Sequence, residues 1–373
     1  MKILRIGSLP SISKPGMGLA VLRLAQTEGF ETIVISYSLV DDQYPEEVKA
    51  LNPLLFPFNN PVMPQSRTGL FFVISQVRRL LVILRFSFSV LWFIKSNKPD
   101  ILHLHSPMHF LIGACARLMR IPTFLTFHGT DFNRIINSWT YQLCIKPIKH
   151  INCVSSHQVG PLKSIFPNAN VRLASNGVDL DEFTSSGNNK SNRTLIAVGS
   201  LRWQKDFDKL IDTFAELAND CKNWNLKIIG DGPDKTKLKL KIKSLGLNTR
   251  VKLLGAISRS EVASELFKAD IFVLSSITEG LPKVLLEAMR ARCGCITFKV
   301  GDCERVLLGS GVVVDAGDHA GLRDAMLELI HSPELRQSLG QKSFCRAGEF
   351  SWVRYQDLHT QLYSNALKAN RSE

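Results

Sequence analysis

The sequence predicts two α/β domains, each built on a doubly wound parallel sheet. The first observation is a length of 373 residues, which is too long for one ordinary domain. The second is a run of short apolar segments that alternate with helix-length stretches, a pattern typical of parallel sheets covered on both faces. The third is that this run occurs twice, on either side of a polar stretch near residues 178–194. We therefore expect two Rossmann-like domains that face each other across a ligand-binding cleft.

The strands follow from short segments rich in β-branched and apolar residues, separated by helix-length stretches. The first series is expected at residues 2–8, 31–38, 100–106, 122–129 and 150–156. The second is expected at residues 194–200, 225–232, 250–257, 270–276, 295–301 and 311–318. These series predict an N-terminal domain over residues 1–182, a C-terminal domain over 183–350 and a terminal helix over 351–373.

The net charge of +13 is concentrated in the first half. Residues 48–178 contain fourteen Lys and Arg but only two acidic residues, Asp100 and Asp131. This asymmetry favours an anionic partner, such as an anionic membrane surface or nucleic acid, over a basic protein without such a partner.

The eight cysteines are scattered and form neither a zinc-ligand spacing nor a disulfide framework. The opening segment MKILRIGSLP has the pattern of a strand rather than a signal peptide. We therefore expect a cytoplasmic protein with free thiols. His103 and His105 occupy alternate positions of one strand without a third ligand nearby in the sequence, so we interpret them as structural.

Residues 70–94 form a long apolar segment that predicts a helix. Its arginines argue against a transmembrane span. On a helix, Ser75, Arg78, Arg79, Arg85 and Ser89 would share one narrow polar stripe. Two interpretations stay open, a helix packed on the sheet with its arginines at the surface and a helix that lies in the membrane interface.

The segment SSITEGLPKVLLEAM, residues 275–289, follows an expected strand and leads into an expected helix. Gly280 permits a close backbone approach to a ligand, and Pro282 suits the first turn of a helix. The amides of Leu281, Lys283 and Val284 would then point outward and favour an anion such as a diphosphate. Glu279 before the helix and Glu287 within it would lie about 12 Å apart and reach hydroxyl groups on either side.

This segment resembles the donor-site motif of the retaining GT-B glycosyltransferases of family 4. Other segments resemble the same family in the expected order. They are KPDILHLH, TFHGTDF, SNGVDLDEF, VGSLRWQKDFDKLIDTF, GDGP, VKLLGAIS, VGDCERVL and FSWVRYQDLHTQLYSNAL. The resemblance extends over nearly the whole chain and implies transfer of a hexosyl unit from a UDP- or GDP-sugar without a required metal.

The resemblance also implies roles for individual residues. Glu279 would bind hydroxyls of the donor sugar, Glu287 the ribose and Lys205 the diphosphate. His128 would approach the reacting sugar. The remaining donor-binding residues implied by the resemblance and by the segment itself are Gly16, Gly18, Arg202, Gly280, Leu281, Lys283 and Val284. The family has an arginine where this chain has Ser200, and Arg202 is the expected substitute.

These observations predict a glycosyltransferase of bacterial surface-polysaccharide assembly, such as lipopolysaccharide, acting on a glycan or lipid-linked acceptor. The basic first half and the segment 70–94 suggest that it sits on the inner membrane face. A nucleotide-sugar epimerase of the same fold stays open as an alternative. A nucleic-acid-binding protein would explain the basic half but not the two glutamates. The missing dinucleotide fingerprint argues against a dehydrogenase.

Overall fold

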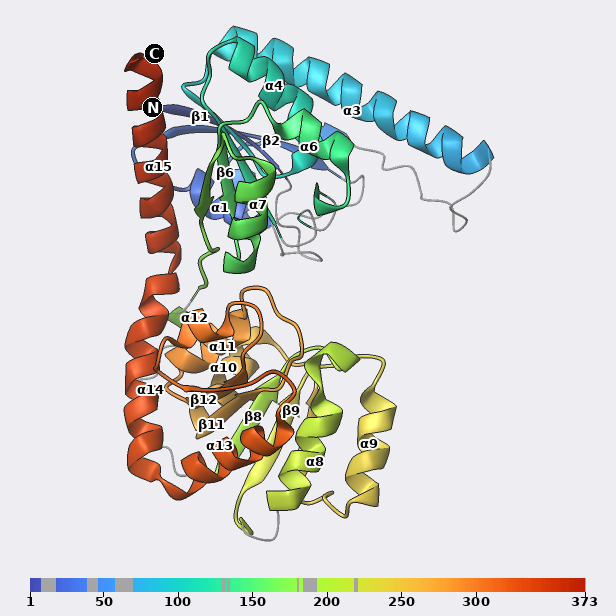
Figure 1. The fold of residues 1–373 in the computed structure, drawn as a ribbon, viewed down its shortest axis with the longest axis vertical. Helices are drawn as coiled ribbons and strands as arrows, with labels where there is room; N and C mark the ends of the chain where they lie inside the picture. The colour runs from blue at the N-terminus through green and yellow to red at the C-terminus, as the bar shows by residue number, and fades with distance from the viewer. Residues whose placement is uncertain are drawn as a thin grey trace. The chain divides into compact units, whose positions relative to one another are not determined.

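The computed structural model describes residues 1–7, 18–38, 46–57, 70–128, 132, 135–179, 181–183, 193–217 and 221–372. The chain forms two compact units (Figure 1). Unit 1 comprises Met1–Asn176 and Tyr355–Glu373, and unit 2 comprises Gly177–Arg354. The domain limits predicted from the sequence are residues 182 and 350, and the chain changes unit a few residues before the first limit and after the second.

Unit 1 contains a seven-stranded sheet in the order β3-β2-β1-β4-β5-β6-β7, and every pair of neighbouring strands is parallel. Its elements are β1 (Lys2–Ile6), α1 (Gly18–Ala25), β2 (Glu31–Ser38), α2 (Glu46–Ala50), β3 (Leu54–Pro57), α3 (Leu70–Asn97), β4 (Ile101–Leu104), η1 (Pro107–His109), α4 (Phe110–Leu118), β5 (Thr123–Phe127), α6 (Trp139–Ile145), β6 (His150–Cys153), η2 (Ser156–Gln158), α7 (Val159–Ile165), β7 (Asn170–Leu173) and most of α15 (Trp352–Ser372).

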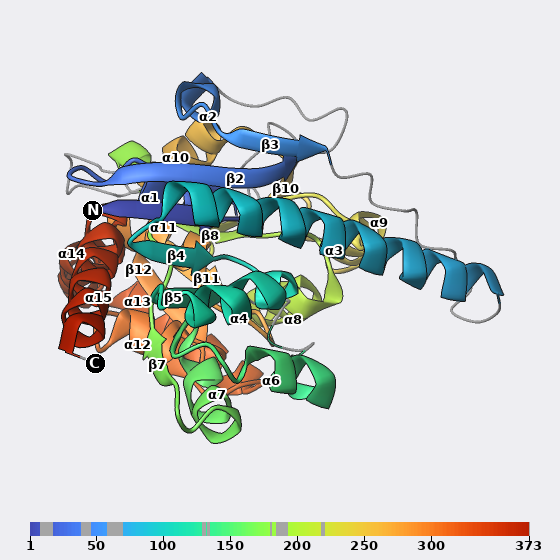
Figure 2. The same cartoon turned by 90° about the horizontal axis from the view of Figure 1, so that it is seen from above.

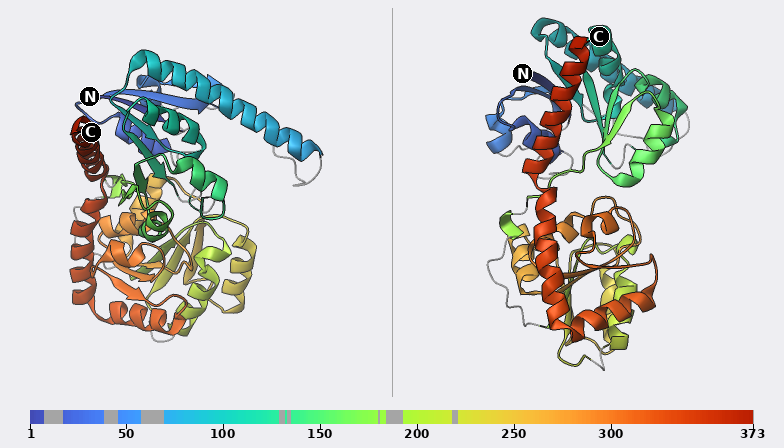
Figure 3. Two further views of the ribbon diagram at one scale, coloured as in Figure 1. Left: turned by 45° about the horizontal axis from the view of Figure 1, so that its top comes forward. Right: turned by 60° about the vertical axis from the view of Figure 1, so that its left-hand side comes forward.

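Alternate residues of the unit 1 strands face opposite helical layers, as the strand period of two requires. Leu102 and Leu104 of β4 pack with α3, α4, α6 and α7 in one core cluster. Ile101 of the same strand packs with Tyr363 and Ala366 of α15 on the other face. The C-terminal helix therefore completes the second helical layer of unit 1 (Figure 3).

Unit 2 contains a six-stranded parallel sheet in the order β10-β9-β8-β11-β12-β13. Its elements are η3 (Asp181–Phe183), β8 (Thr194–Val198), η4 (Trp203–Lys205), α8 (Phe207–Leu217), β9 (Asn225–Ile229), α9 (Lys235–Ser244), β10 (Val251–Gly255), α10 (Arg259–Lys268), β11 (Ile271–Leu274), α11 (Lys283–Arg290), β12 (Gly294–Phe298), α12 (Cys303–Leu307), β13 (Val312–Val314), α13 (His319–His331), α14 (Pro333–Ala347) and η5 (Gly348–Phe350). The strand order reverses between β8 and β11, where open α/β sheets bind their ligands.

The unit 2 sheet is also covered on both faces. Ile271 and Val273 of β11 pack with α8, α9 and α13, whereas Phe272 and Leu274 pack with α10, α11 and α12. This is the near-continuous apolar strand of a buried parallel sheet. The expectation of two doubly wound domains is confirmed.

Helix α3 is the long helix expected from residues 70–94, and Figure 2 shows it beside α4. The structure describes its side chains from Leu81 onward. One face buries Phe86, Val90 and Ile94 in the unit 1 core. The opposite side exposes four apolar side chains one turn apart, namely Leu81, Leu84, Phe88 and Trp92. Within the part of the chain that the structure describes, no helix is both long and apolar enough to cross a membrane.

Candidate functional site

A cavity of about 550 Å³ lies in unit 2 beyond the carboxyl ends of β8, β10 and β11. It is the place where the strand order predicts a ligand. Six of the expected site residues line this cavity. Ser200 and Arg259, which were not predicted as site residues, line it as well. The full described lining is Phe183, Val198, Gly199, Ser200, Lys205, Ile257, Arg259, Val262, Glu279, Leu281, Pro282, Lys283, Val284 and Glu287.

Lys205 and Glu279 form an ion pair on one side of the cavity. The Nζ atom of Lys205 donates to Oε1 of Glu279 at 2.5 Å, and the two side chains are only 20% and 13% exposed. The loop after β11 is tied to η4 by two further bonds. Ser275 Oγ donates to the Lys205 carbonyl at 2.8 Å, and the Ile277 amide donates to the Gln204 carbonyl at 2.9 Å. These two bonds hold the segment that carries Glu279 against the segment that carries Lys205.

The loop that carries Glu279 packs closely against the start of α12. Gly301 has φ +52°, and a Cβ atom there would overlap the Glu279 carbonyl oxygen. The buried Asp302 donates its amide to the Gly280 carbonyl at 3.1 Å, and its carboxylate accepts from Arg305 at 2.9 Å. Glycine at position 301 is required both by the backbone conformation and by this close approach.

Glu287 and Arg259 form a second ion pair in the same cavity, although Arg259 was not among the residues predicted from the sequence. Glu287 lies in the second turn of α11, and its Oε1 accepts from Arg259 Nη1 at 3.0 Å. Arg259 Nη2 donates to the Asp179 carbonyl at 2.9 Å, and the guanidinium lies 4.7 Å from the Phe183 ring centroid. Three contacts thus fix the orientation of this arginine.

A signal for Arg259 was present in the sequence. Arg259 is the first residue of α10, directly after Ser258, which forms a capping box with Glu261. A cap that follows a strand places the next side chain at the carboxyl edge of the sheet. This edge also carries Ser200, where the related family has an arginine.

Lys283 adds a third cation near the start of α11. Much of its side chain is exposed to solvent. Neighbouring protein atoms nevertheless displace water from the ammonium group, and this desolvation lowers the pKa of Lys283. Glu287 opposes this shift and Arg259 adds to it. Pro282 lies one residue before the helix, with extended backbone angles, rather than in its first turn as expected. Among the described residues, the amides of Leu281, Lys283 and Val284 find no backbone acceptor, as expected for a helix start.

Two expected residues of unit 2, Gly280 and Arg202, do not line this cavity. The Gly280 carbonyl instead accepts the Asp302 amide. Arg202 lines a different hollow of about 170 Å³, together with Trp203, Asp208 and Lys237. The expectation that Arg202 substitutes for the arginine missing at Ser200 is therefore not supported by its position.

The expected residues of unit 1 form a separate group. His128 follows β5 directly, is buried, and stacks on His105 with ring centroids 6.0 Å apart. Gly18 is the buried first residue of α1. Gly16 lies outside the described residues.

His103 and His105 lie in a buried polar cluster beneath α15. His103 Nδ1 lies 2.6 Å from the Tyr363 hydroxyl, and its Nε2 lies 2.8 Å from Thr126 Oγ1. Burial, reinforced by neighbouring histidines, lowers the pKa of both imidazoles well below the usual range. Among the described residues, no group of three His, Cys, Asp or Glu side chains is close enough to hold a metal ion.

Family comparisons agree with this architecture. The model of the family "Glycosyltransferase Family 4" matches residues 19–182, and the model "Glycosyl transferases group 1" matches residues 179–344. Together the two models match most of the chain, and each falls largely on one structural unit.

Glycosyltransferase relatives match parts of this chain at moderate identity. N-acetyl-alpha-D-glucosaminyl L-malate synthase of Bacillus anthracis is 26% identical over 65% of this chain and 68% of the relative. The amylovoran biosynthesis glycosyltransferase AmsD of Erwinia amylovora is 30% identical over 51% of this chain and 53% of the relative.

Solved structures share the fold over nearly the whole length. The Anabaena protein Alr3699/HepE in complex with UDP has a TM-score of 0.72 at 17% identity, over 98% of this chain and 100% of that chain. Two doubly wound units, two matching family models and glycosyltransferase relatives lead to one conclusion: the chain belongs to the glycosyltransferases and has the GT-B fold.

Proposed function

We propose that this glycosyltransferase is a retaining family 4 enzyme that transfers a hexosyl unit from a UDP- or GDP-sugar to a glycan or lipid-linked acceptor. The observation that carries the proposal is the pairing of Lys205 with Glu279 and of Arg259 with Glu287 in one cavity at the reversal point of the unit 2 sheet. With Lys283 included, two carboxylates and three cations line this cavity. This combination suits a ligand with a diphosphate between two groups rich in hydroxyls.

Each residue then has a chemical role. Lys205 and Arg259 bind the diphosphate, assisted by the amides at the start of α11. Glu279 accepts hydrogen bonds from the donor sugar, and Glu287 accepts them from the ribose. Both carboxylates are already oriented by their cations, which reduces the cost of ordering them on binding.

The proposed reaction needs no metal. The glycosidic bond between the sugar and the diphosphate breaks, and the acceptor oxygen bonds to the same carbon on the same face. The proton of the acceptor hydroxyl passes to the leaving phosphate. Lys205, Arg259 and the helix amides stabilise the negative charge that develops on the diphosphate. We assign His128 a role at the transferred sugar.

Bacterial surface-polysaccharide synthesis on the inner membrane face is the proposed setting. The exposed apolar stripe of α3, consisting of Leu81, Leu84, Phe88 and Trp92, suits the boundary between headgroups and acyl chains. The basic residues of unit 1 would add attraction to anionic lipid. The relative AmsD is named for amylovoran biosynthesis, which agrees with a polysaccharide product.

Nucleotide binding tests the site most directly. We expect Arg259→Gln to weaken UDP or GDP binding by about tenfold or more, because a charge-assisted hydrogen bond contributes about 1.5–3 kcal/mol. Arg202→Gln is the matched control and should change affinity by less than about twofold, since Arg202 lines another hollow. Isothermal titration of a panel of nucleotide diphosphates measures both variants.

A transfer assay with labelled UDP- and GDP-sugars then tests the chemistry. Glu279→Gln should lower sugar transfer strongly while nucleotide binding is largely kept. If Arg202→Gln loses nucleotide binding and Arg259→Gln does not, the assignment of the cavity is wrong. Conversion of a sugar nucleotide incubated without acceptor would indicate an epimerase.

Vesicle binding tests the proposed setting. The protein should sediment with vesicles that contain phosphatidylglycerol, and added salt should weaken this binding because it screens surface charge. Replacing Phe88 and Trp92 with Ser should reduce binding several-fold. Trp203→Ser, an equally exposed tryptophan of unit 2, serves as the control. Equal loss in both variants would argue against a role for α3.

A further inference from the structure

A second cavity, of about 260 Å³, lies in unit 1 at the amino ends of β5 and β6. Arg117 and Arg120 come from the end of α4 and the turn after it. Lys149 lies directly before β6, and His150 is the first residue of that strand. The last turns of α15 close it with Ala366, Ala369 and Asn370. Among its described lining residues none is acidic.

Hydrogen bonds to backbone carbonyls fix the positions of both arginines. Arg117 Nη1 donates to the Pro147 carbonyl at 2.8 Å, which orients its guanidinium. Asn370 Nδ2 donates to the Arg120 carbonyl at 3.0 Å and so joins α15 to the turn that carries this arginine. Arg120 adopts φ +59°, a left-handed conformation that costs a side-chain-bearing residue free energy and is often found at functional sites.

His150 adds to the lining of the cavity an imidazole ring that can form hydrogen bonds. The His150 imidazole stacks on Phe124 with centroids 4.6 Å apart and an interplanar angle of 17°. Burial, followed by the charge of Lys149, lowers the pKa of His150. The neutral ring has one donor and one acceptor nitrogen. Arg117, Arg120 and Lys149 themselves are exposed to solvent, so an incoming anion can reach them.

We infer that this cavity binds a phosphate-bearing anion, with Arg120 and Lys149 as its principal ligands and Arg117 and His150 beside them. Guanidinium groups match the paired oxygens of a phosphate, and no carboxylate among the described lining residues competes for them. The strands of a parallel sheet all end at the opposite edge, where transfer chemistry belongs, so this site is separate from the reaction centre.

Two sources of the phosphate share this chemistry. One is a soluble diphosphate or phosphorylated metabolite. The other is the headgroup of an anionic lipid, which the neighbouring Leu118 and Met119 favour because they are 86% and 43% exposed between the two arginines. In either case the bound anion would join α15, the end of α4 and the start of β6.

The test compares two charge-matched double variants of the full chain. Arg120→Gln with Lys149→Gln removes two charges from the cavity. Lys146→Gln with Lys163→Gln removes two exposed charges of unit 1 that do not line it. Inorganic pyrophosphate is titrated by calorimetry, with and without saturating UDP. Vesicles of phosphatidylglycerol and of phosphatidylcholine are tested by sedimentation. Melting temperatures establish that both variants fold.

We expect the cavity variant alone to weaken binding of pyrophosphate, phosphatidylglycerol vesicles or both by at least about tenfold, equivalent to about 1.4 kcal/mol. Loss of pyrophosphate binding identifies a soluble ligand, and loss of vesicle binding alone identifies a headgroup. If neither probe binds the unmodified protein, or if both variants lose affinity equally, the site does not exist. UDP binding reports on unit 2 independently, so failure of this proposal is distinguishable from failure of the proposed function.

Discussion

Arg5 shows how single residues determine the interior of unit 1. It is fully buried in β1, and Nη1 donates to the Tyr363 hydroxyl at 2.8 Å and lies 3.2 Å from His103 Nδ1. Its Nε and Nη2 atoms find no hydrogen-bond partner among the described residues. A buried charge with so few partners makes each remaining hydrogen bond important, because the lost hydration is not otherwise replaced.

Tyr363→Phe should therefore destabilise unit 1 by about 1–3 kcal/mol, since it removes a hydroxyl that Arg5 and His103 share. The aromatic packing on Phe124, with centroids 5.0 Å apart, would be kept. Urea denaturation measures the change. Tyr141→Phe in α6 is the control and should cost less than about 0.5 kcal/mol, because that tyrosine is half-buried at the surface. If both variants lose the same free energy of unfolding, the hydrogen bonds of the Tyr363 hydroxyl do not stabilise unit 1 as expected.

The individual residues of the candidate site differ in how far the sequence could predict them. Lys205, Glu279 and Glu287 could be proposed because each belongs to a local segment with a clear pattern, and all three line one cavity. Arg259 was missed because its partner Glu287 belongs to the next helix, so that no single local segment contains both residues. Arg202 was favoured for its closeness in sequence, but η4 directs it to another hollow.

At the scale of elements, the apolar segments located every central strand, but two strands were missed. These are β3 and β7, the two edges of the unit 1 sheet. Edge strands pair with a neighbour on one side only, and both of these are short, at four residues each. Leu54 and Leu55 of β3 are 39% and 43% exposed, and only one of the four residues of β7 is buried. Their pairing depends on a neighbouring strand rather than on their own pattern.

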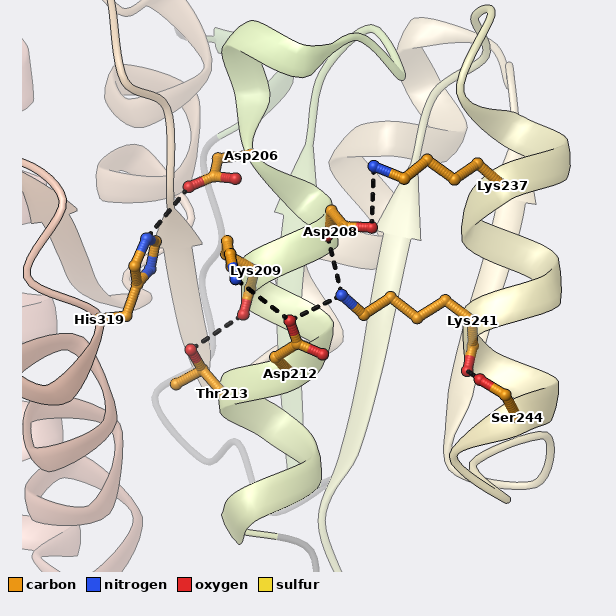
Figure 4. A network of polar contacts seen from close by, with 9 residues as sticks. All are labelled: Asp206, Asp208, Lys209, Asp212, Thr213, Lys237, Lys241, Ser244 and His319. Carbon is orange, nitrogen blue, oxygen red and sulfur yellow. Dashed lines mark hydrogen bonds and ion pairs between the residues drawn. The ribbon is translucent and has the colours of Figure 1, made fainter.

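Helices α8 and α9 are joined by a network of charges (Figure 4). Lys241 of α9 donates to Asp208 at 2.8 Å and to Asp212 at 2.6 Å, and Lys237 lies 3.2 Å from Asp208. Burial alone would raise the pKa of Asp208, but its bonds to Lys241 and Lys237 outweigh burial and lower it. Burial opposes the charge of Lys241 too, yet the two aspartates raise its pKa.

Lys241→Met should destabilise unit 2 by about 1 kcal/mol, a value limited by the partial exposure of the aspartates. Lys237→Met is the control and should cost less, because the Lys237 side chain is 66% exposed. A depressed acid pKa stabilises the fold above the unfolded value near 3.9, and a raised lysine pKa stabilises it below about 10.4. The difference between Lys241→Met and the parent should therefore persist between about pH 4 and 10 and shrink outside that range. Hydrogen exchange of α8 and α9 measures it, and a difference that grows below pH 4 would contradict the assignment.

At the scale of the molecule, the two units share a topology but differ in their buried chemistry. The unit 2 sheet buries apolar side chains on both faces. One face of the unit 1 sheet instead carries Arg5, His103, Thr126 and Asn152 beneath α15. The alternation of strands and helices predicted two similar domains. It did not predict this difference, because the polar residues are buried only when the C-terminal helix returns to unit 1.

Acid should consequently destabilise unit 1 before unit 2. The buried histidines among the described residues all belong to unit 1: His103, His105, His109, His128 and His359. Burial lowers the pKa of His109 to about 4 and that of His359 to about 3. In the unfolded chain each would have a pKa near 6.5, so below that pH the unfolded state binds more protons than the folded state. Stability is therefore lost as pH falls from about 6.5 toward 4, by about 1.4 kcal/mol per pH unit for each such histidine.

Hydrogen exchange at pH 7.5 and pH 5, corrected for the intrinsic rate, measures the loss in each unit. By pH 5 His109 and His359 alone should remove about 4 kcal/mol, a large part of the stability of an ordinary domain. Peptides from β4 and α15 should lose protection, whereas those from β8 and β11 should keep theirs, because His319 and His331 of unit 2 are not buried. Parallel loss in both units, or earlier loss in unit 2, would mean that buried histidines do not set the acid sensitivity. The expected order instead makes the buried histidines of unit 1 the cause of acid sensitivity in the enzyme.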